Sequence, residues 1–353
     1  MIESIPADIA VELGRADRGA YFEQRLFVLS PLNTFWTTLL IFAVLIGSFA
    51  VAATLSGIPL FVIDAHGIRF AASTRFAALF SLLITTVLGM QRFSRVRERA
   101  DFMAHAAVLK GGVVDACEVT ALTPGSARLG RANLIGIVIG LLLCWTIVRP
   151  TPALQTLATY GWFCVITVLV SVLFARGVTL TRGAGRDARR NIENRLVVDL
   201  LRVDRLSVIG RSAARAALIW FVISAVICLF FIGGGIDPFT IGLLIGCAAM
   251  GVWIFIATME MVRRKIRIAK AAELERVRTE IDVARHDPGD HLQGLLAYEA
   301  RIHAVHEWPF DQTTLVRVGA SAFILTVPWF ALASMKMASN CPACSGTATI
   351  HCR

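Results

Sequence analysis

NTFWTTLLIFAVLIGSFAVAATL, residues 33–55, is an unbroken run without a charged side chain. A hydrocarbon core of about 30 Å is crossed by roughly 20 apolar residues in helical form. Backbone N–H and C=O groups find no water in lipid, so a single crossing segment of this length has to be a helix. The stretch therefore predicts a transmembrane helix and decides the fold class of the chain.

Six further stretches have a similar length and composition. The chain is 56% hydrophobic and its mean hydropathy is +0.67, as expected when much of the surface faces lipid. The stretches are Phe70 to Met90, Ala132 to Val148, Leu154 to Phe174, Ala216 to Ile232, Phe239 to Met259 and Val318 to Met335. The sequence thus predicts an all-α, polytopic transmembrane helical bundle of seven spans.

Lys and Arg are distributed unevenly between the connections. They gather in residues 91–131, 176–215 and 263–267, whereas the alternate connections are nearly bare. Because cytoplasmic loops retain positive charge during insertion, we expect a cytoplasmic N-terminus and, after an odd number of crossings, a C-terminus outside. This pattern fits a multi-pass protein of the cell inner (plasma) membrane.

The formal net charge of +10 arises mainly from these Lys and Arg residues in the connections. It favours anionic lipid headgroups as partners. No RNA-binding or DNA-binding motif accompanies the charge, so nucleic acid is not expected.

The predicted topology divides the chain into five parts. Residues 1–32 form a cytoplasmic N-terminal segment that lacks the apolar region of a removable signal peptide. The other parts are a six-span membrane core at 33–260, a cytoplasmic helical segment at 261–312, the seventh span at 313–337 and a cysteine-containing external tail at 338–353.

Two segments of the membrane core are similar to each other. Residues 131–144 read RANLIGIVIGLLLC and residues 215–228 read RAALIWFVISAVIC, with seven of fourteen positions identical. Each is followed by a short turn and another span. We therefore predict a tandem duplication of a helical hairpin, at 131–174 and 215–259, of the kind found in transporter and channel folds.

Small residues recur within these hairpins. Gly136 and Gly140 form one GxxxG motif, and Gly242 and Gly246 form another. Small residues let helix backbones approach closely in lipid. The motifs therefore predict helix packing within the chain, with a homo-oligomer interface or a thin-walled pore as alternatives. Pro328 in the last span removes a backbone hydrogen bond, which predicts a bend or a gate.

The cytoplasmic segments are long enough to form helices of their own. A charge-mixed run from Met261 to Arg285 is expected to extend the sixth span as a solvated helix. An amphipathic helix with Leu292, Leu295, Leu296 and Ile302 on one face should follow it, and residues 191–210 carry a similar pattern. Such helices pack on each other or lie on headgroups, and a cytoplasmic protein partner is the alternative.

Two groups of side chains have the types found in metal or redox sites. Glu299, His303 and His306 share one helix at ligand spacing, although solvated histidines are the simpler interpretation because one helix rarely completes a site. Cys341 and Cys344 form a CxxC in the tail, where an external location favours a disulfide.

Several classes of function are excluded on sequence grounds. The middle of every predicted span lacks an ionisable residue, which argues against a proton-coupled pump. No nucleotide-binding, metalloprotease or hydrolase motif is present, so neither an enzyme nor a cofactor is expected. The leading hypothesis is a passive channel or uncoupled transporter. The alternative is a membrane scaffold or sensor subunit that binds a partner through its basic cytoplasmic helices.

Overall fold

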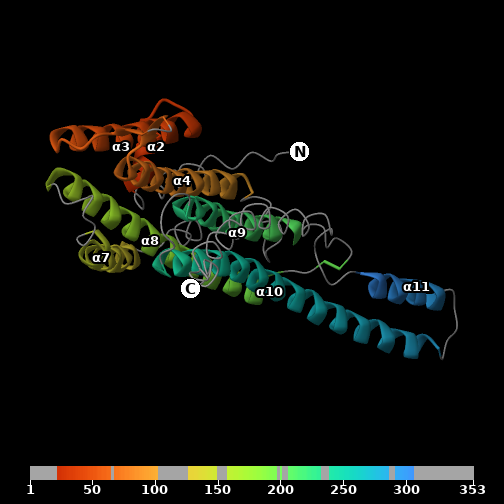
Figure 1. Ribbon diagram of the computed structural model, residues 1–353. Helices are drawn as coiled ribbons and strands as arrows, with labels where there is room; N and C mark the ends of the chain where they lie inside the picture. Colours follow the sequence, from red (N-terminus) through yellow and green to blue (C-terminus); the bar gives the residue numbers. More distant parts are fainter. Residues whose placement is uncertain are drawn as a thin grey trace, which may run out of the picture.

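The computed structural model describes residues 22–64, 67–101, 126–148, 157–196, 199–200, 206–231, 238–285 and 291–305 (Figure 1). These residues are almost entirely helical. Six helices are long and apolar enough to cross a membrane, at Thr34–Leu55, Ala72–Arg97, Leu129–Thr146, Ala158–Gly183, Ser207–Cys228 and Ile241–Ala284. The chain is thus a multi-pass membrane protein. The predicted seventh span lies outside the described residues, so the count of seven and the orientation of the termini stay predictions.

The first span, α3 (Thr34–Leu55), follows a short helix, α2 (Phe22–Leu29). Asn33 caps α3, since its Oδ1 accepts a hydrogen bond from the Trp36 N–H at 3.0 Å. Gly57 ends the helix with a φ of +66°, a conformation that glycine adopts without strain. The boundaries predicted from the sequence differ from α3 by one residue.

Two short strands, which were not predicted from the sequence, follow α3. β1 (Phe61–Asp64) pairs antiparallel with β2 (Gly67–Phe70), with Phe61 opposite Phe70. Phe70, the predicted start of the second span, is therefore the last residue of a strand. The span itself is α4 (Ala72–Ala100), which continues ten residues beyond the predicted end at Met90. Aromatic and β-branched residues favour this hairpin, which departs from the all-α prediction.

α4 lies in the middle of the bundle. Its residue Ala77 packs with Phe49 of α3 and Phe163 of the fourth span. On another side, Leu83 packs with Trp220 of the fifth span and Leu244 of the sixth. The core of the bundle is thus built around α4 from residues far apart in the sequence.

The third and fourth spans form an antiparallel pair. α7 (Ser126–Leu143) continues as one π-helical turn, η1 (Cys144–Val148), before α8 (Leu157–Arg195) returns beside it. α8 extends well beyond the predicted span, which ended at Phe174. The predicted helix over residues 191–210 is not continuous, because α8 ends at Arg195 and the next helix begins at Ser207.

The fifth and sixth spans form a second antiparallel pair. α9 (Ser207–Cys228) ends in a 3₁₀ turn, η4 (Leu229–Phe231), and packs on α10 (Pro238–Ala284). α10 has 47 residues, so it is about 70 Å long at 1.5 Å per residue. Its second half leaves the bundle, and α11 (His291–Ala304) packs beside that half (Figure 1). The predicted boundary at residue 260 falls inside this single helix.

Candidate functional site

The first GxxxG motif lies in the contact between α7 and α8. A Cβ atom at Gly136 would lie 2.5 Å from the Cα of Val172, and one at Gly140 would lie 2.6 Å from the Cα of Val168. Such distances leave no room for a side chain. The two helices approach backbone to backbone at these glycines, as small residues permit in lipid.

The second GxxxG motif has a different environment. Gly242 and Gly246 are exposed on α10, and a Cβ atom at either would meet no heavy atom of the described chain within 4 Å. The opposite face of the same helical turns carries Leu244 and Cys247, which are buried against α9. The motif therefore faces away from the bundle.

Gly251, which the sequence analysis did not single out, makes the close contact between α9 and α10. A Cβ atom there would lie 3.2 Å from the carbonyl oxygen of Ala217 and 3.1 Å from the Cε1 of Phe221. The only sequence signal was an isolated glycine in a helical pattern, which often has a packing reason.

Most hydroxyl groups within the spans hydrogen-bond to their own helix. Ser224 donates to the Trp220 carbonyl at 2.9 Å, and Thr85 donates to the Ser81 carbonyl at 2.8 Å. Trp162 differs, because its Nε1–H donates to the Ser48 Oγ at 2.9 Å and joins α8 to α3. These hydroxyls mainly satisfy local backbone carbonyls.

One buried cation lies near the end of the fourth span. Arg176 of α8, two residues beyond the predicted span, is only 3% exposed. A second arginine, Arg215 of α9, forms an ion pair with Asp101 at the end of α4, with 2.7 Å between Nη1 and Oδ2. Neither feature was predicted from the sequence, because residues just past an apolar run are normally solvated.

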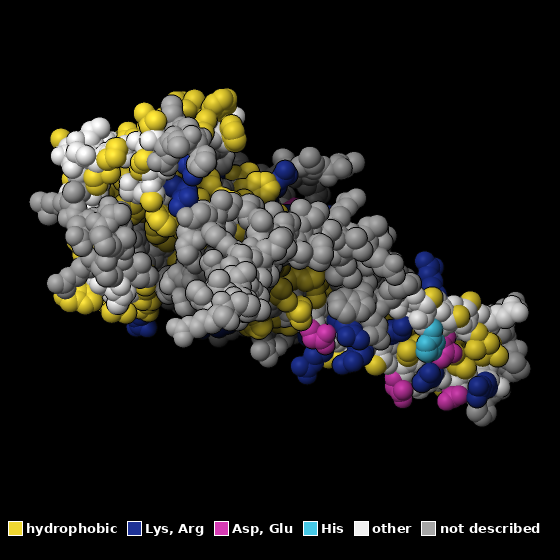
Figure 2. Space-filling model, in the orientation of Figure 1, with side chains coloured by type: hydrophobic (Ala, Val, Ile, Leu, Met, Phe, Trp, Pro, Cys, Tyr) yellow, Lys and Arg dark blue, Asp and Glu magenta, His cyan; other side chains and the backbone are white. Residues whose placement is uncertain are grey.

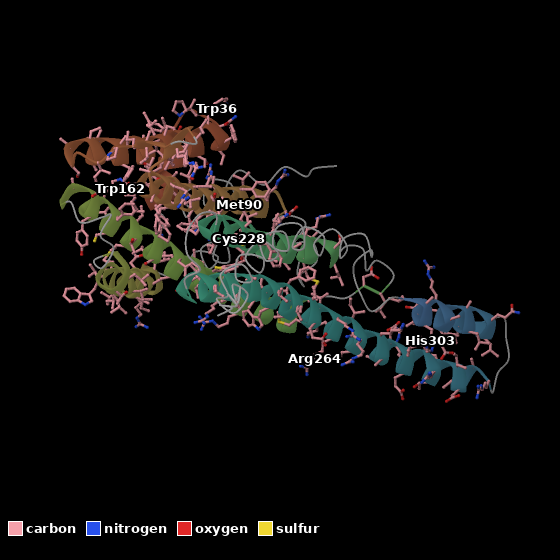
Figure 3. All side chains as sticks on the ribbon, viewed as in Figure 1. Trp36, Met90, Trp162, Cys228, Arg264 and His303 are labelled. Carbon is pink, nitrogen blue, oxygen red and sulfur yellow. The ribbon has the colours of Figure 1, made fainter. Side chains whose placement is uncertain are left out.

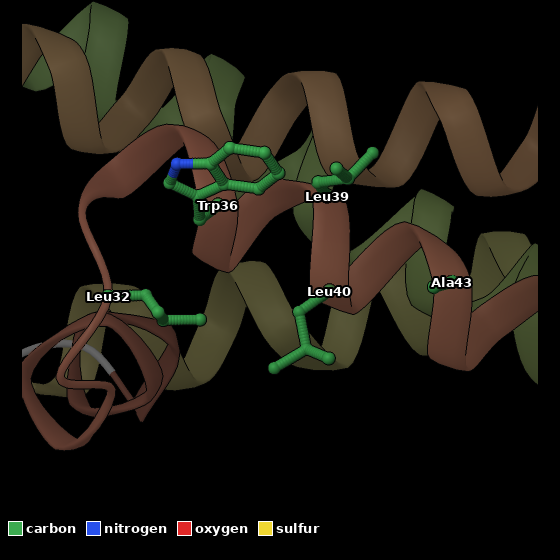
Figure 4. Close-up of a pocket in the computed structure, with 5 residues that line it drawn as sticks. All are labelled: Leu32, Trp36, Leu39, Leu40 and Ala43. Atoms are coloured by element: carbon green, nitrogen blue, oxygen red, sulfur yellow. The ribbon is translucent and has the colours of Figure 1, made fainter.

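An apolar hollow of about 280 Å³ lies at the start of α3 (Figure 4). Its lining consists of Leu32, Trp36, Leu39, Leu40 and Ala43. These are the side chains expected on a lipid-facing surface, and they provide no catalytic group.

The second half of α10 and α11 form a helical hairpin with its own core, which we call the stalk (residues 261–305). Val262, Ile266, Val277 and Ile281 of α10 pack with Leu295 and Ile302 of α11, together with Leu200 and Leu206. Ile302 and Val277 are completely buried. The amphipathic helix expected from the sequence is present as α11. Leu295 and Ile302 of the predicted apolar face pack on α10, whereas Leu296, also assigned to that face, is 48% exposed.

Polar contacts hold the two stalk helices in register. Lys270 Nζ donates to the carbonyl oxygens of His303 at 2.9 Å and Val305 at 3.0 Å. Tyr298 donates to Glu273 Oε1 at 3.0 Å. Burial, with the hydrogen bond to Glu273 as a second cause, raises the pKa of Tyr298 above its ordinary value.

Two of the three predicted metal ligands, Glu299 and His303, lie on α11, and Figure 3 labels His303 there. His303 Nε2 is 3.8 Å from Glu299 Oε1, and the same carboxylate oxygen is 3.2 Å from Arg278 Nε. Glu299 is therefore engaged with a cation. His306 lies outside the described residues, and within the described ranges no three His, Cys, Asp or Glu side chains come together. The metal site stays a prediction.

Charged side chains of both signs gather on the stalk, among apolar and other side chains, whereas apolar ones are prominent on the visible surface around α3 (Figure 2). The part of α10 nearest the bundle is basic, with Arg263, Arg264, Lys265 and Arg267. Further along, Arg276 forms ion pairs with Glu273 and Glu280. The stalk thus changes from basic near the membrane to mixed charge toward its tip.

The remaining predicted site residues, Pro328, Cys341 and Cys344, lie outside the described residues. Among the described cysteines, Cys144, Cys164, Cys228 and Cys247 are free thiols. Comparisons with protein-family models, curated proteins and solved structures give no match for this chain. Its function has to be argued from the molecule itself.

Proposed function

We propose that this multi-pass membrane protein is a scaffold subunit that presents the stalk to a cytoplasmic protein partner. The observation that carries the proposal is the continuity of α10, which runs as one helix from the apolar bundle to the charged stalk. A continuous helix transmits position and orientation, because a sharp kink in it requires a local disruption of its hydrogen-bond ladder.

The stalk has the properties of a binding element. From Met261 to Ala284, α10 extends roughly 36 Å at 1.5 Å per residue. The separate apolar core shared with α11 keeps this extension ordered. Exposed charges of both signs suit electrostatic recognition of a protein surface.

A passive channel or uncoupled transporter is the second candidate. The observation that favours it is the exposed face at Gly242 and Gly246. A second copy of the chain can approach closely at such a face, and a path for solutes can form between copies. At Gly136 and Gly140, in contrast, the α8 backbone already fills the space next to the motif.

Photo-crosslinking in native membranes tests the scaffold proposal. A photoreactive amino acid replaces Val283 or Leu296, which are 71% and 48% exposed on the stalk, and Leu134, which is exposed on α7, serves as the control position. We expect one protein adduct of defined mass from both stalk positions and none from position 134. Breaking the stalk core with Ile302→Ala should remove the adduct.

Solute flux into liposomes separates the two candidates. The scaffold proposal is overturned in favour of the channel by two results together. The chain would form no stalk-specific adduct in native membranes, and the purified protein would conduct ions or small solutes in a way that Gly246→Leu abolishes.

A further inference from the structure

The β1–β2 hairpin exposes apolar side chains to its surroundings. Phe61 is 52% exposed, Ile63 81% and Phe70 65%. The rings of Phe61 and Phe70 lie side by side with centroids 5.2 Å apart. In water, an exposed cluster of this kind is unfavourable because each side chain would lose its gain from burial.

The hairpin is fixed at the membrane boundary. It joins the end of α3 at Leu55 to the start of α4 at Ala72, and both helices are spans. Its base is attached to α4, because the Leu60 carbonyl accepts hydrogen bonds from Ala71 N and from Thr74 Oγ1, each at 3.1 Å. Leu60 also packs on the cluster of Phe49 and Phe163. The strands therefore cannot move far from the bilayer.

The dimensions agree with a location in the headgroup layer. Each strand has four residues, or about 13 Å at 3.3 Å per residue. The polar layer of one leaflet is roughly 5–8 Å thick, half the difference between the full bilayer and its hydrocarbon core. A hairpin tethered at its base to both spans can therefore place its side chains at the boundary between headgroups and acyl chains.

The polar groups of the hairpin favour this layer over the hydrocarbon core. The described sheet has two strands, so each strand has an outer edge whose backbone groups need water, and headgroups are hydrated. Arg69 is exposed and stands opposite Val62 in the strand register. A guanidinium at that place can reach lipid phosphates while the neighbouring side chains contact acyl chains.

We propose that the β1–β2 hairpin is an interfacial anchor, which inserts Phe61, Ile63 and Phe70 into the leaflet in which α3 ends. The anchor fixes the height of α3 in the bilayer. This helix benefits from such a support because only 11% of its span is buried inside the protein. The occupant of the apolar surface is lipid, rather than a second copy of the chain or another protein.

Spin labelling tests the proposal. The eight native cysteines are replaced by Ala, and one cysteine is introduced by Ile63→Cys, Val44→Cys or Val283→Cys. Val44 lies exposed on the span α3 and Val283 lies exposed on the stalk. Each labelled protein is reconstituted into vesicles of phosphatidylcholine and phosphatidylglycerol, after size-exclusion chromatography has verified a folded, monodisperse sample.

Collision rates with oxygen, which dissolves in lipid, and with a water-soluble nickel chelate are then measured by power saturation. The label at position 63 should collide with nickel several-fold less than that at position 283 and retain high oxygen accessibility, with a depth between positions 283 and 44. Nickel accessibility equal to that at position 283 would place the hairpin in water and overturn the proposal. Low accessibility to both reagents would indicate protein contact, and dipolar broadening would indicate a second copy; either result also overturns it.

Discussion

Gly136 lies directly against the backbone of Val172: a Cβ atom on the glycine would be 2.5 Å from the valine Cα. Real Cβ atoms do not approach carbon this closely, so a side chain at position 136 has to push α7 away from α8. Within the described residues α7 has few other neighbours, since it packs mainly on α8, whereas α8 also packs on α3, α4 and α10.

Gly136→Leu should therefore destabilise the bundle by about 1–3 kcal/mol or more, the usual cost of overpacking. Thermal unfolding in detergent, followed by fluorescence-detected size-exclusion chromatography, measures the effect. Gly161→Leu is the matched control, because Gly161 is an exposed helical glycine on α8 with no neighbour of the described chain within 4 Å of its Cβ position. Equal stability of the two variants would contradict the close approach of α7 and α8.

The ion pair between Asp101 and Arg215 should couple α4 to α9. Both side chains are largely buried, at 21% and 17% exposed, so removing one charge leaves the other poorly compensated. A double-mutant cycle of Asp101→Asn and Arg215→Gln is expected to give a coupling free energy of about 1–2 kcal/mol. Arg264→Gln, at an exposed position on α10, should leave stability unchanged. Strictly additive effects of the two substitutions would show that the charges do not interact.

The stalk should unfold separately from the bundle when a buried side chain of its core is truncated. Ile302 is completely buried, whereas Leu296 on the same helix is about half exposed. Ile302→Ala should cost about 2–5 kcal/mol, and Leu296→Ala should change stability by less than about 0.5 kcal/mol. Limited trypsin digestion checks this, because the α10 part of the stalk is rich in Lys and Arg. We expect rapid cleavage there only in Ile302→Ala, and similar digestion of both variants would argue against a stalk core.

Tyr298 should make the stalk sensitive to alkaline pH. Its pKa is raised in the folded protein, by burial and then by the hydrogen bond to Glu273. A raised pKa means that the stabilisation is complete below the ordinary tyrosine pKa of about 10 and is lost as pH rises through the higher folded value. Tyr298→Phe should lower the free energy of unfolding by about 1 kcal/mol at pH 8. The variant should also lack the loss of stability at alkaline pH.

Phenolate absorbance and helical circular dichroism between pH 8 and 12 measure both effects. The protein has three tyrosines, so the difference between the titrations of wild type and Tyr298→Phe isolates residue 298. A Tyr298 titration at or below the ordinary value would refute the prediction.

The helical spans could be predicted to a large extent from the sequence. The predicted first span, residues 33–55, differs from α3 by one residue, and α10 continues past Met259 as its charge-mixed extension indicated. The β1–β2 hairpin was not predicted, because its short apolar strands merge with the neighbouring span in a hydropathy pattern. Phe70 was placed in a helix for this reason, although it pairs with Phe61.

The candidate sites were harder to predict. The sequence places Glu299 and His303 on one helix, but it contains no local sign that Arg278, 21 residues earlier, binds the same carboxylate. The burial of Arg176 also depends on helices distant in the sequence. Such contacts arise when helices pack, and no periodicity within one segment specifies them.

By itself the sequence determined that the chain crosses a membrane as helices, because transfer of apolar side chains and satisfaction of the backbone within one segment are local properties. Only the tertiary structure decided which glycines matter. Gly136 and Gly251 face neighbouring helices, whereas Gly246, in a motif identical to that of Gly136, faces outward. The difference lies in the rotation of each helix about its axis, which is set by the shapes of all its neighbours together.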